Sequence, residues 1–391
     1  MSDDPILEAD WLKNPETQAI LAALDGAERR TRIVGGVIRD TIMDVKRASA
    51  DIDMATELLP DEVMARAKAA GMASYPTGIE HGTVTLKLGE TIAEVTTLRR
   101  DVETDGRHAV VAFGTDWVED ASRRDFTLNA LYCDADGTLF DPLDGVGDAL
   151  SGVVRFIGDA SQRIAEDGLR VYRFFRFSAS HGGQQFDVGG LAACADAAGR
   201  LEHLSRERVG AEMTRMLALP KVAGTLTEMA DIGLFKADDD ALAALGAYEA
   251  IGGQSVAARL ALLADGRFEQ VQDEWRLGNA LVKEATGIAA AAEILADERI
   301  GEAAYRHGEL AIEGLAVAAS RGGWSRARLA EVARMLAATV VPDFPISGHD
   351  LAGLGLIPGP ALGQELARLE RAWLESGFAL RKAELLALVG R

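Results

Sequence analysis

Residues 32–53, RIVGGVIRDTIMDVKRASADID, contain the signals that decide how this chain begins to fold. The apolar residues after Arg32 predict a short β-strand, and the Gly-Gly pair that follows predicts a tight turn. Residues 37–44 predict a helix. A basic segment comes next, and residues 51–53, DID, predict a second strand. The stretch therefore predicts a compact unit in which a strand, a turn and a helix lead into another strand.

The turn has the chemistry of a phosphate-binding loop. Gly35 and Gly36 allow backbone N–H groups to approach an anion closely, and the N-terminus of the following helix favours negative charge. Arg39 lies in the first turn of that helix and can add a charged contact. A Gly-Gly pair alone is common in ordinary loops, so the prediction depends on the residues that follow.

Two aspartates end the unit. Asp51 and Asp53 are two residues apart on a predicted strand, so their side chains point to the same face. Two adjacent carboxylates are costly unless a cation lies between them, and hard oxygen ligands favour Mg²⁺. A lone Asp-x-Asp is more often a solvated strand end. Following a phosphate loop, however, the pair predicts nucleotidyl transfer with Asp51 and Asp53 as metal ligands.

A second charged motif follows at residues 123–131, RRDFTLNAL. The paired guanidinium groups of Arg123 and Arg124 suit the oxygens of a triphosphate, and the carboxylate of Asp125 suits a ribose hydroxyl. Taken alone, such a cluster is usually an exposed group of surface charges.

Residues 161–180, SQRIAEDGLRVYRFFRFSAS, predict one amphipathic helix that is capped by Asp159 and stopped by the glycines at 182 and 183. Glu166, Arg170 and Arg173 are spaced by four and three residues and so share a face, and Asp167 is three residues from Arg170. A ladder of surface salt bridges is the common outcome of such spacing. A binding face is the alternative.

Composition limits the class of protein. The chain has 391 residues, 48% of them hydrophobic and 26% charged, which is typical of a globular protein with two to four compact units. Its two cysteines, Cys133 and Cys194, support neither a disulfide framework nor a structural zinc site. The acidic N-terminus lacks an apolar signal core, and no stretch reaches the roughly 20 apolar residues of a membrane span. We therefore expect a cytoplasmic protein without a membrane partner.

The net charge of −20 argues against a protein that coats nucleic acid through a general positive surface. Any RNA binding should therefore depend on a few clustered arginines and lysines, because local charge sets the field at a site.

These motifs, in this order, resemble those of the polymerase-β-like nucleotidyltransferases. The closest pattern is that of the class II CCA-adding tRNA nucleotidyltransferases and bacterial poly(A) polymerases: GG…RD…DxD, then RRDFTxNA, then EDxxRxxR at residues 166–173. A segment like DPxxGxxDL begins at Asp141, with Ala149 interposed before the leucine. The resemblance covers at least residues 32–212, and residues 345–366 resemble the C-terminal module of the bacterial tRNA enzymes.

The resemblance implies an α+β fold, with a polymerase-β-like head on a small mixed sheet followed by all-helical parts. We expect a head at residues 1–150, a neck that selects the base at 151–215, a helical body at 216–340 and a helical tail that contacts tRNA at 341–391. The strands should end by about residue 157. His349-Asp350 suggests a metal phosphohydrolase, but the further ligands are missing and SGHDL reads as a helix cap.

Glu94 lies inside one of two alternating strands, residues 83–88 and 91–97. It is either an ordinary solvent-facing residue or the third metal-side carboxylate that this superfamily usually has, and both interpretations remain open.

The implied reaction adds C, C and A to the tRNA 3′ end from CTP and ATP, by two-metal nucleotidyl transfer and without a nucleic-acid template. An Asp167–Arg170 pair would offer an acceptor beside a donor, which matches cytosine and adenine but leaves polar groups unpaired with uracil or guanine. The implied site comprises the catalytic Asp51, Asp53 and Glu94, with Mg²⁺ on the two aspartates, and the nucleotide-binding Gly35, Gly36, Arg39, Arg123, Arg124, Asp125, Asn129, Asp167, Arg170 and Arg173.

Several related functions stay open. Poly(A) synthesis is disfavoured because those enzymes usually end in a long basic extension. Addition of CC alone or of A alone shares these motifs, and the basic residues of the expected mobile loop, Arg99 to His108, favour complete CCA addition. An RNA-binding protein without catalysis is disfavoured by the intact pair Asp51 and Asp53. The motifs imply no protein partner.

Overall fold

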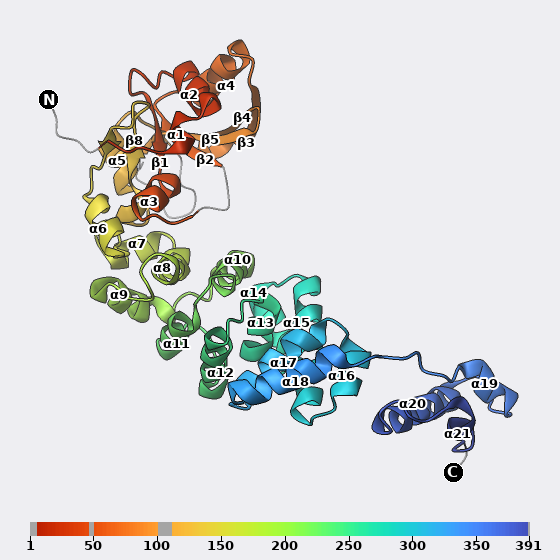
Figure 1. Cartoon of the computed structure of the whole chain (residues 1–391). Helices are drawn as coiled ribbons and strands as arrows, with labels where there is room; N and C mark the ends of the chain where they lie inside the picture. Colours follow the sequence, from red (N-terminus) through yellow and green to blue (C-terminus); the bar gives the residue numbers. More distant parts are fainter. Residues whose placement is uncertain (1–5, 47–50, 101–111, 390–391) are drawn as a thin grey trace. The chain divides into compact units, whose positions relative to one another are not determined.

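The computed structural model describes residues 6–46, 51–100 and 112–389 (Figure 1). The chain divides into two compact units. Unit 1 comprises Met1–Leu204 with Asp231–Leu234, and unit 2 comprises Ser205–Ala230 with Phe235–Arg391. Within the described ranges, no helix is long and apolar enough to cross a membrane. The four-part division into head, neck, body and tail stays a prediction.

Unit 1 is built on a mixed seven-stranded sheet. Strands β2 and β5 are parallel, and the other neighbouring strands are antiparallel. This confirms the expected α+β head on a small sheet, and both predicted strands around Glu94 have the predicted bounds. In spatial order the strands are β3 (Ala73–Gly78), β4 (Thr83–Leu88), β5 (Thr91–Thr97), β2 (Ile52–Thr56), β1 (Thr31–Val34), β8 (Tyr132–Cys133) and β9 (Leu139–Phe140).

The helices of the head follow their local signals. The side chain of Asn14 caps α2 by accepting the N–H of Glu16 at 2.8 Å, as its position before Pro15 predicts. Gly71, with a φ of +75°, follows α4. The helices are α1 (Asp10–Lys13), α2 (Pro15–Ala23), α3 (Gly36–Ile42), α4 (Pro60–Ala69), α5 (Trp117–Ser122) and α6 (Gly145–Ser151), with short 3₁₀ turns η1 (Ile79–His81) and η2 (Thr127–Asn129).

The expected mobile loop from Arg99 to His108 lies largely outside the described residues. Its first two residues form strand β6 (Arg99–Arg100), which pairs with β7 (Ala112–Phe113) in a separate two-stranded sheet.

The prediction of one continuous helix over residues 161–180 is wrong. The structure has two helices, α7 (Ala160–Glu166) and α8 (Leu169–Ser180), separated at Asp167 and Gly168. Asp167 has an extended backbone, and its side chain accepts the N–H of Leu169 at 3.1 Å, so it begins a new helix. A Cβ on Gly168 would lie 2.7 Å from the Cδ2 atom of Leu201, so a larger residue here would require that leucine to shift. The predicted cap by Asp159 is confirmed, because its side chain accepts the N–H of Gln162 at 2.8 Å.

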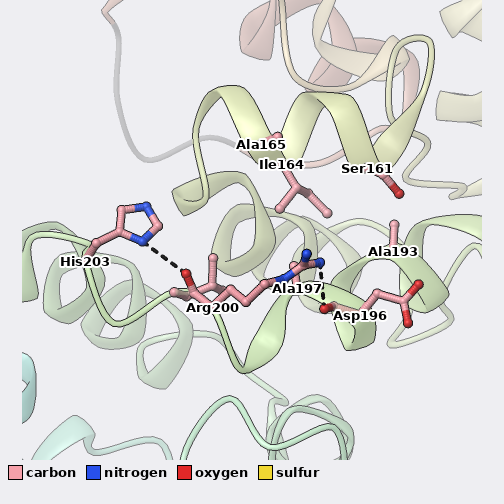
Figure 2. A pocket seen from close by; sticks show the side chains of 9 residues that line it. Ser161, Ile164, Ala165, Ala193, Asp196, Ala197, Arg200 and His203 are labelled. Carbon is pink, nitrogen blue, oxygen red and sulfur yellow. Dashed lines mark hydrogen bonds between the residues drawn. The ribbon is translucent and has the colours of Figure 1, made fainter. Parts of the chain in front are cut away.

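Helix α9 (Val188–Ala198) completes this part of unit 1 and lies beside α7. Ile164 of α7 and Ala193 and Ala197 of α9 line a cavity of about 370 Å³ between the two helices (Figure 2). Arg200 and His203 also line it. One face of α7 is therefore turned toward α9.

Aromatic packing joins the second charged motif to α8. Phe126, which follows Asp125 directly, is fully buried. Its ring centroid lies 5.0 Å from that of Phe156 and 5.6 Å from that of Phe177 on α8. Burial of such rings contributes a large hydrophobic free energy and a specific geometry. The polar residues around Phe126 are thus held on a rigid support.

Both cysteines of the chain are buried in unit 1 and carry free thiols. Burial raises the pKa of the Cys133 thiol to about 12, and burial also raises the pKa of Cys194. Neither thiol is a nucleophile at neutral pH.

Beyond Leu201, the described residues form helices and no strands, as predicted. Ser205 caps α10 by accepting the N–H of Arg208 at 3.3 Å, and Ser347 and Asp350 form a capping box, which confirms the reading of SGHDL as a cap. The helices are α10 (Arg206–Leu217), α11 (Ala223–Asp231), α12 (Asp239–Ala250), α13 (Val256–Ala264), α14 (Phe268–Trp275), α15 (Asn279–Ala296), α16 (Ile300–His307), α17 (Leu310–Arg321), α18 (Arg326–Ala338), α19 (Gly348–Gly353), α20 (Pro360–Glu375) and α21 (Lys382–Leu386).

Candidate active site

Three carboxylates come from two neighbouring strands. Asp51 lies just before β2, and Asp53 lies within it; both are exposed, whereas Ile52 between them is buried. Asp53 is paired in register with Glu94 on the parallel strand β5. Paired residues on neighbouring strands point to the same face, so Glu94 stands beside Asp53 on the exposed side of the sheet. This geometry supports the interpretation of Glu94 as a third metal-side carboxylate.

The donor set fits a hard divalent cation, because each of these side chains offers carboxylate oxygens. Among the described residues, no three histidine, cysteine or acidic side chains already stand in a complete metal-binding group. The carboxylates are therefore gathered on one face without forming a closed cage.

The predicted turn requires glycine at its first position. Gly35 has a φ of +79°, which side-chain-bearing residues rarely adopt, and its carbonyl accepts the first N–H bonds of α3. Its own N–H donates to the carbonyl of Leu131 at 2.9 Å. Gly36 then begins α3. The turn thus holds the end of β1 against the segment that carries Asn129.

Arg39 lies deeper than its position in the sequence suggested. It is 7% exposed, and its guanidinium donates to the side chain of Asn129 at 2.6 Å and to Asp40 at 2.6 and 2.8 Å. Burial opposes ionisation of Asp40, but His181 and Arg39 outweigh it and lower its pKa. The contact of Arg39 with a phosphate stays a prediction, and its described contacts are those of a buried support.

The network continues to Asp125 and Arg173. Asn129 donates to Asp125 at 3.2 Å, and Arg173 of α8 donates from Nε to the other carboxylate oxygen at 2.7 Å. Asp125 is buried; burial opposes its ionisation, but the charge of Arg173 outweighs that effect and lowers its pKa. The second charged motif is therefore tied to α8 by a buried ion pair.

A polar cavity of about 310 Å³ lies next to Asp53. It contains three arginines, Arg99, Arg123 and Arg124, and is lined by Val34, Asp53, Met54, Thr96, Arg99, Asp120, Arg123 and Arg124. Burial and, to a smaller extent, repulsion by Arg123 lower the pKa of Arg99. Such a cavity favours a polyanion. Asp53 of the first motif and Arg123 and Arg124 of the second motif thus line the same cavity.

Arg99 was named in the sequence only as the start of a loop. Its Nε atom is buried and has no hydrogen-bond partner among the described residues. A buried donor without an acceptor is costly, and a ligand oxygen in the cavity would satisfy it. The Thr-Leu-Arg-Arg sequence at the end of β5 was the available signal, since it places two cations directly after the strand that carries Glu94.

Asp120 was also missed. It is buried and accepts from the Tyr132 hydroxyl at 3.0 Å and from Arg124 Nη2 at 3.2 Å. These contacts fix the guanidinium of Arg124 on one side. The spacing of four residues between Asp120 and Arg124 was the available local signal, whereas only the fold brings Tyr132 on β8 to this position.

The residues predicted to select a base lie at the break between α7 and α8. Arg170 forms an ion pair with Glu166 at 2.7 Å and donates to the backbone carbonyls of Arg163 at 2.8 Å and Arg123 at 3.3 Å. Asp167 accepts the N–H of Leu169. Glu166 and Arg170 therefore form the ion pair that their spacing of four residues predicts, and the pairing of Asp167 with Arg170 stays a prediction.

Comparison with known proteins agrees with this site. A family model described as the poly(A) polymerase head domain matches residues 31–155, and one described as the probable RNA and SrmB-binding site of polymerase A matches residues 190–237. The CCA tRNA nucleotidyltransferase 1, mitochondrial, of Mus musculus is 33% identical and is aligned over 97% of this chain and 92% of its own length.

The chain belongs to the CCA-adding tRNA nucleotidyltransferase family. The CCA-adding enzyme of Limosilactobacillus fermentum is 31% identical over 95% of each chain. The crystal structure of the Bacillus stearothermophilus CCA-adding enzyme in complex with CTP is 27% identical, with a TM-score of 0.73, and covers 93% of this chain and 94% of that one.

Proposed function

We propose that this chain adds C, C and A to the 3′ end of tRNA, using CTP and ATP without a nucleic-acid template and releasing pyrophosphate. The observation that carries the proposal is the pairing of Asp53 with Glu94 beside a cavity that contains three arginines. An acidic face next to a polycationic cavity suits a triphosphate whose α-phosphorus is attacked by a hydroxyl.

Asp51, Asp53 and Glu94 are the residues that would hold Mg²⁺. When bound, Mg²⁺ lowers the pKa of an attacking hydroxyl and stabilises developing negative charge on phosphate oxygens. The exposed carboxylates on one face of the sheet supply the hard oxygen ligands that this ion prefers. The identity of the metal is part of the proposal.

The arginines of the cavity would bind the triphosphate. Arg123 and Arg124 supply forked donors for phosphate oxygens, and the unsatisfied Nε of Arg99 supplies another. Asp125 is the residue proposed for the ribose. In this assignment Gly35 and Gly36 shape the turn beside the phosphates, and Asn129 and Arg173 position Asp125.

Arg39 is assigned a positioning role near the phosphates. Its bond to Asn129 fixes the amide that donates to Asp125, so loss of Arg39 would disturb the ribose contact indirectly.

Base selection is assigned to Asp167 and Arg170, with Arg173 in support. An acceptor and a donor held side by side satisfy the amino group and the ring nitrogen of cytosine or adenine. Because Arg170 is paired with Glu166 in the described structure, its guanidinium is oriented by that carboxylate before any base is bound.

The test uses purified protein, Mg²⁺ and a tRNA transcript that lacks its 3′ CCA. CTP alone, ATP alone or both are supplied, and the products are sized at one-nucleotide resolution. We expect growth by two nucleotides with CTP and by three with both, followed by a stop.

The other outcomes identify the alternatives. A stop at two nucleotides with both substrates identifies a CC-adding enzyme. A second transcript that already ends in CC tests for an A-adding enzyme, which would extend this transcript by one nucleotide and leave the first one unchanged. A long ladder with ATP alone identifies poly(A) synthesis. No growth on any RNA end would overturn the proposal in favour of RNA binding without catalysis.

The proposal retains the four-part division of the chain, with the tail contacting tRNA, and a cytoplasmic location.

A further inference from the structure

Three consecutive backbone carbonyls lie at the C-terminal end of α5: that of Ser122, its last residue, and those of Arg123 and Arg124. The last carbonyls of a helix lack partners within the helix and need other donors. Here the donors come from the neck. Arg163 donates from Nη2 to the carbonyls of Ser122 at 2.5 Å and Arg124 at 3.0 Å, and Arg170 donates to the carbonyl of Arg123 at 3.3 Å.

Arg163 also contacts the base-selecting segment. Its Nη1 donates to Glu166 at 2.7 Å, and the same Oε2 atom of Glu166 accepts from Arg170 at 2.7 Å. The backbone carbonyl of Arg163 accepts a further bond from Arg170 at 2.8 Å. One side chain therefore touches both the backbone of the phosphate-binding arginines and the carboxylate that orients Arg170.

Arg163 has little freedom to move. Its side chain is 9% exposed, compared with 39% for Glu166. On a different face of α7, the neighbouring Ile164 is buried and lines the cavity shared with α9 (Figure 2). Helix α7 is thus held between α9 and the end of α5, and Arg163 projects from it to the segment that carries Arg123 and Arg124.

We infer that Arg163 is a positioning residue that couples triphosphate binding to base selection. The inference rests on the proposed function and adds a residue to it. By holding the two segments together, Arg163 sets the distance between the triphosphate and the guanidinium of Arg170. A nucleotide whose base pairs correctly with Arg170 then has its α-phosphorus at the metal-side carboxylates. A nucleotide with a mismatched base does not.

The nucleotide preference is the decisive readout, because a residue that only stabilises the fold would lower all incorporation equally. Three full-length variants are compared with the wild type: R163M, R163K and R200M. R163M removes the positive charge. R163K keeps a cation, but its single ammonium group cannot reach two carbonyls and Glu166 together. Arg200 is an exposed neck arginine whose Nη2 donates to the carbonyl of Asp196, four residues earlier, and it serves as the matched control (Figure 2).

The measurement is kcat/KM for CTP and for UTP on tRNA lacking CCA, together with the melting temperature and the Kd for tRNA. In R163M we expect the ratio of kcat/KM for CTP to kcat/KM for UTP to fall about tenfold or more. Once Arg170 is no longer held in position, the polar groups that uracil leaves unpaired disfavour UTP less. The ratio should fall less in R163K and should keep the wild-type value in R200M. The Kd for tRNA should be unchanged in all three variants.

A wild-type ratio in R163M and R163K would overturn the inference, even with reduced turnover. If R163M fails to fold, R163K alone decides, and a wild-type ratio in that variant is the contrary result. Failure of the wild type and R200M to extend tRNA would instead reject the proposed function, so the two failures are distinguishable.

Discussion

Asp53 on β2 and Glu94 on β5 are directly paired across two parallel strands. The pairing brings together residues 41 positions apart and puts both carboxylates on the exposed face of a sheet whose flanking residues, Ile52 and Val95, are buried. A one-residue shift of either strand would turn its carboxylate to the other face, because side chains alternate along a strand. The register of β2 and β5 is therefore what assembles the acidic side of the site.

Replacement of Glu94 tests whether this carboxylate acts in the reaction. E94Q keeps the size of the side chain and removes the charge, so we expect CMP incorporation to fall about a hundredfold with an unchanged melting temperature. E90Q is the matched control, since Glu90 is an exposed residue in the turn before the same strand. Rapid-quench assays over a range of Mg²⁺ concentrations measure the effect. Equal rates in E94Q and E90Q would assign Glu94 to the solvent-facing surface.

Removal of Arg173 should destabilise unit 1. R173M leaves the buried carboxylate of Asp125 without its ion-pair partner, at a cost of about 3 kcal/mol in the free energy of unfolding. The double variant D125N/R173M removes that charge as well and should regain part of the loss, while incorporation stays low in both. Urea unfolding measures the stability. Equal destabilisation in the single and double variants would show that the pair does not stabilise the fold.

Gly168 offers a test of the break between α7 and α8. In G168A the new methyl group would meet Leu201 at 2.7 Å and Leu204 at 3.3 Å, so we expect a loss of about 1–2 kcal/mol in the free energy of unfolding and poorer discrimination between CTP and UTP. G199A is the control, because a Cβ there meets nothing within 4 Å. Thermal melts and incorporation assays are the measurements. A G168A variant as stable as the wild type would mean that the neighbouring leucines move freely.

Protonation of His181 should decrease the stability of unit 1 in mild acid. Burial and repulsion by Arg39 lower the pKa of His181 below its usual 6.5, although Asp40 opposes this, and Arg176 lowers it further. A group whose pKa is lowered by folding contributes stability that is fully present above pH 6.5 and is lost as the pH falls below it. H181Q keeps a donor for Asp40 without this titration. Its melting temperature should therefore change less than that of the wild type between about pH 7.5 and pH 5.5. Parallel curves for the two proteins would contradict the assignment.

Local signals predicted much of this molecule. The caps at Asn14, Asp159 and Ser205 act through residues two or three positions away, and the strands around Glu94 are visible from their alternation. The order of the motifs predicted which family the chain belongs to. Such features are predictable because the residues that determine them are neighbours in the sequence.

The features that escaped prediction depend on residues far apart in the chain. Leu201 and Leu204, more than 30 residues further along the chain, lie close beside Gly168 at the break between α7 and α8. Arg39 was predicted only as a phosphate contact, and its bond to Asn129, 90 residues away, which makes it part of a buried network, was not foreseen. No window of sequence contains both partners of either contact.

The burial of Cys133 and Cys194 makes this chain suitable for spectroscopy. With both native thiols shielded and their pKa values raised, maleimide reagents would have no rapid target in the folded protein. Cysteines introduced at two exposed positions, Glu90 and Arg200, would then be the residues labelled. Fluorophores attached at such sites would report, in real time, whether loading of CTP or ATP changes the distance between the sheet and the neck helices.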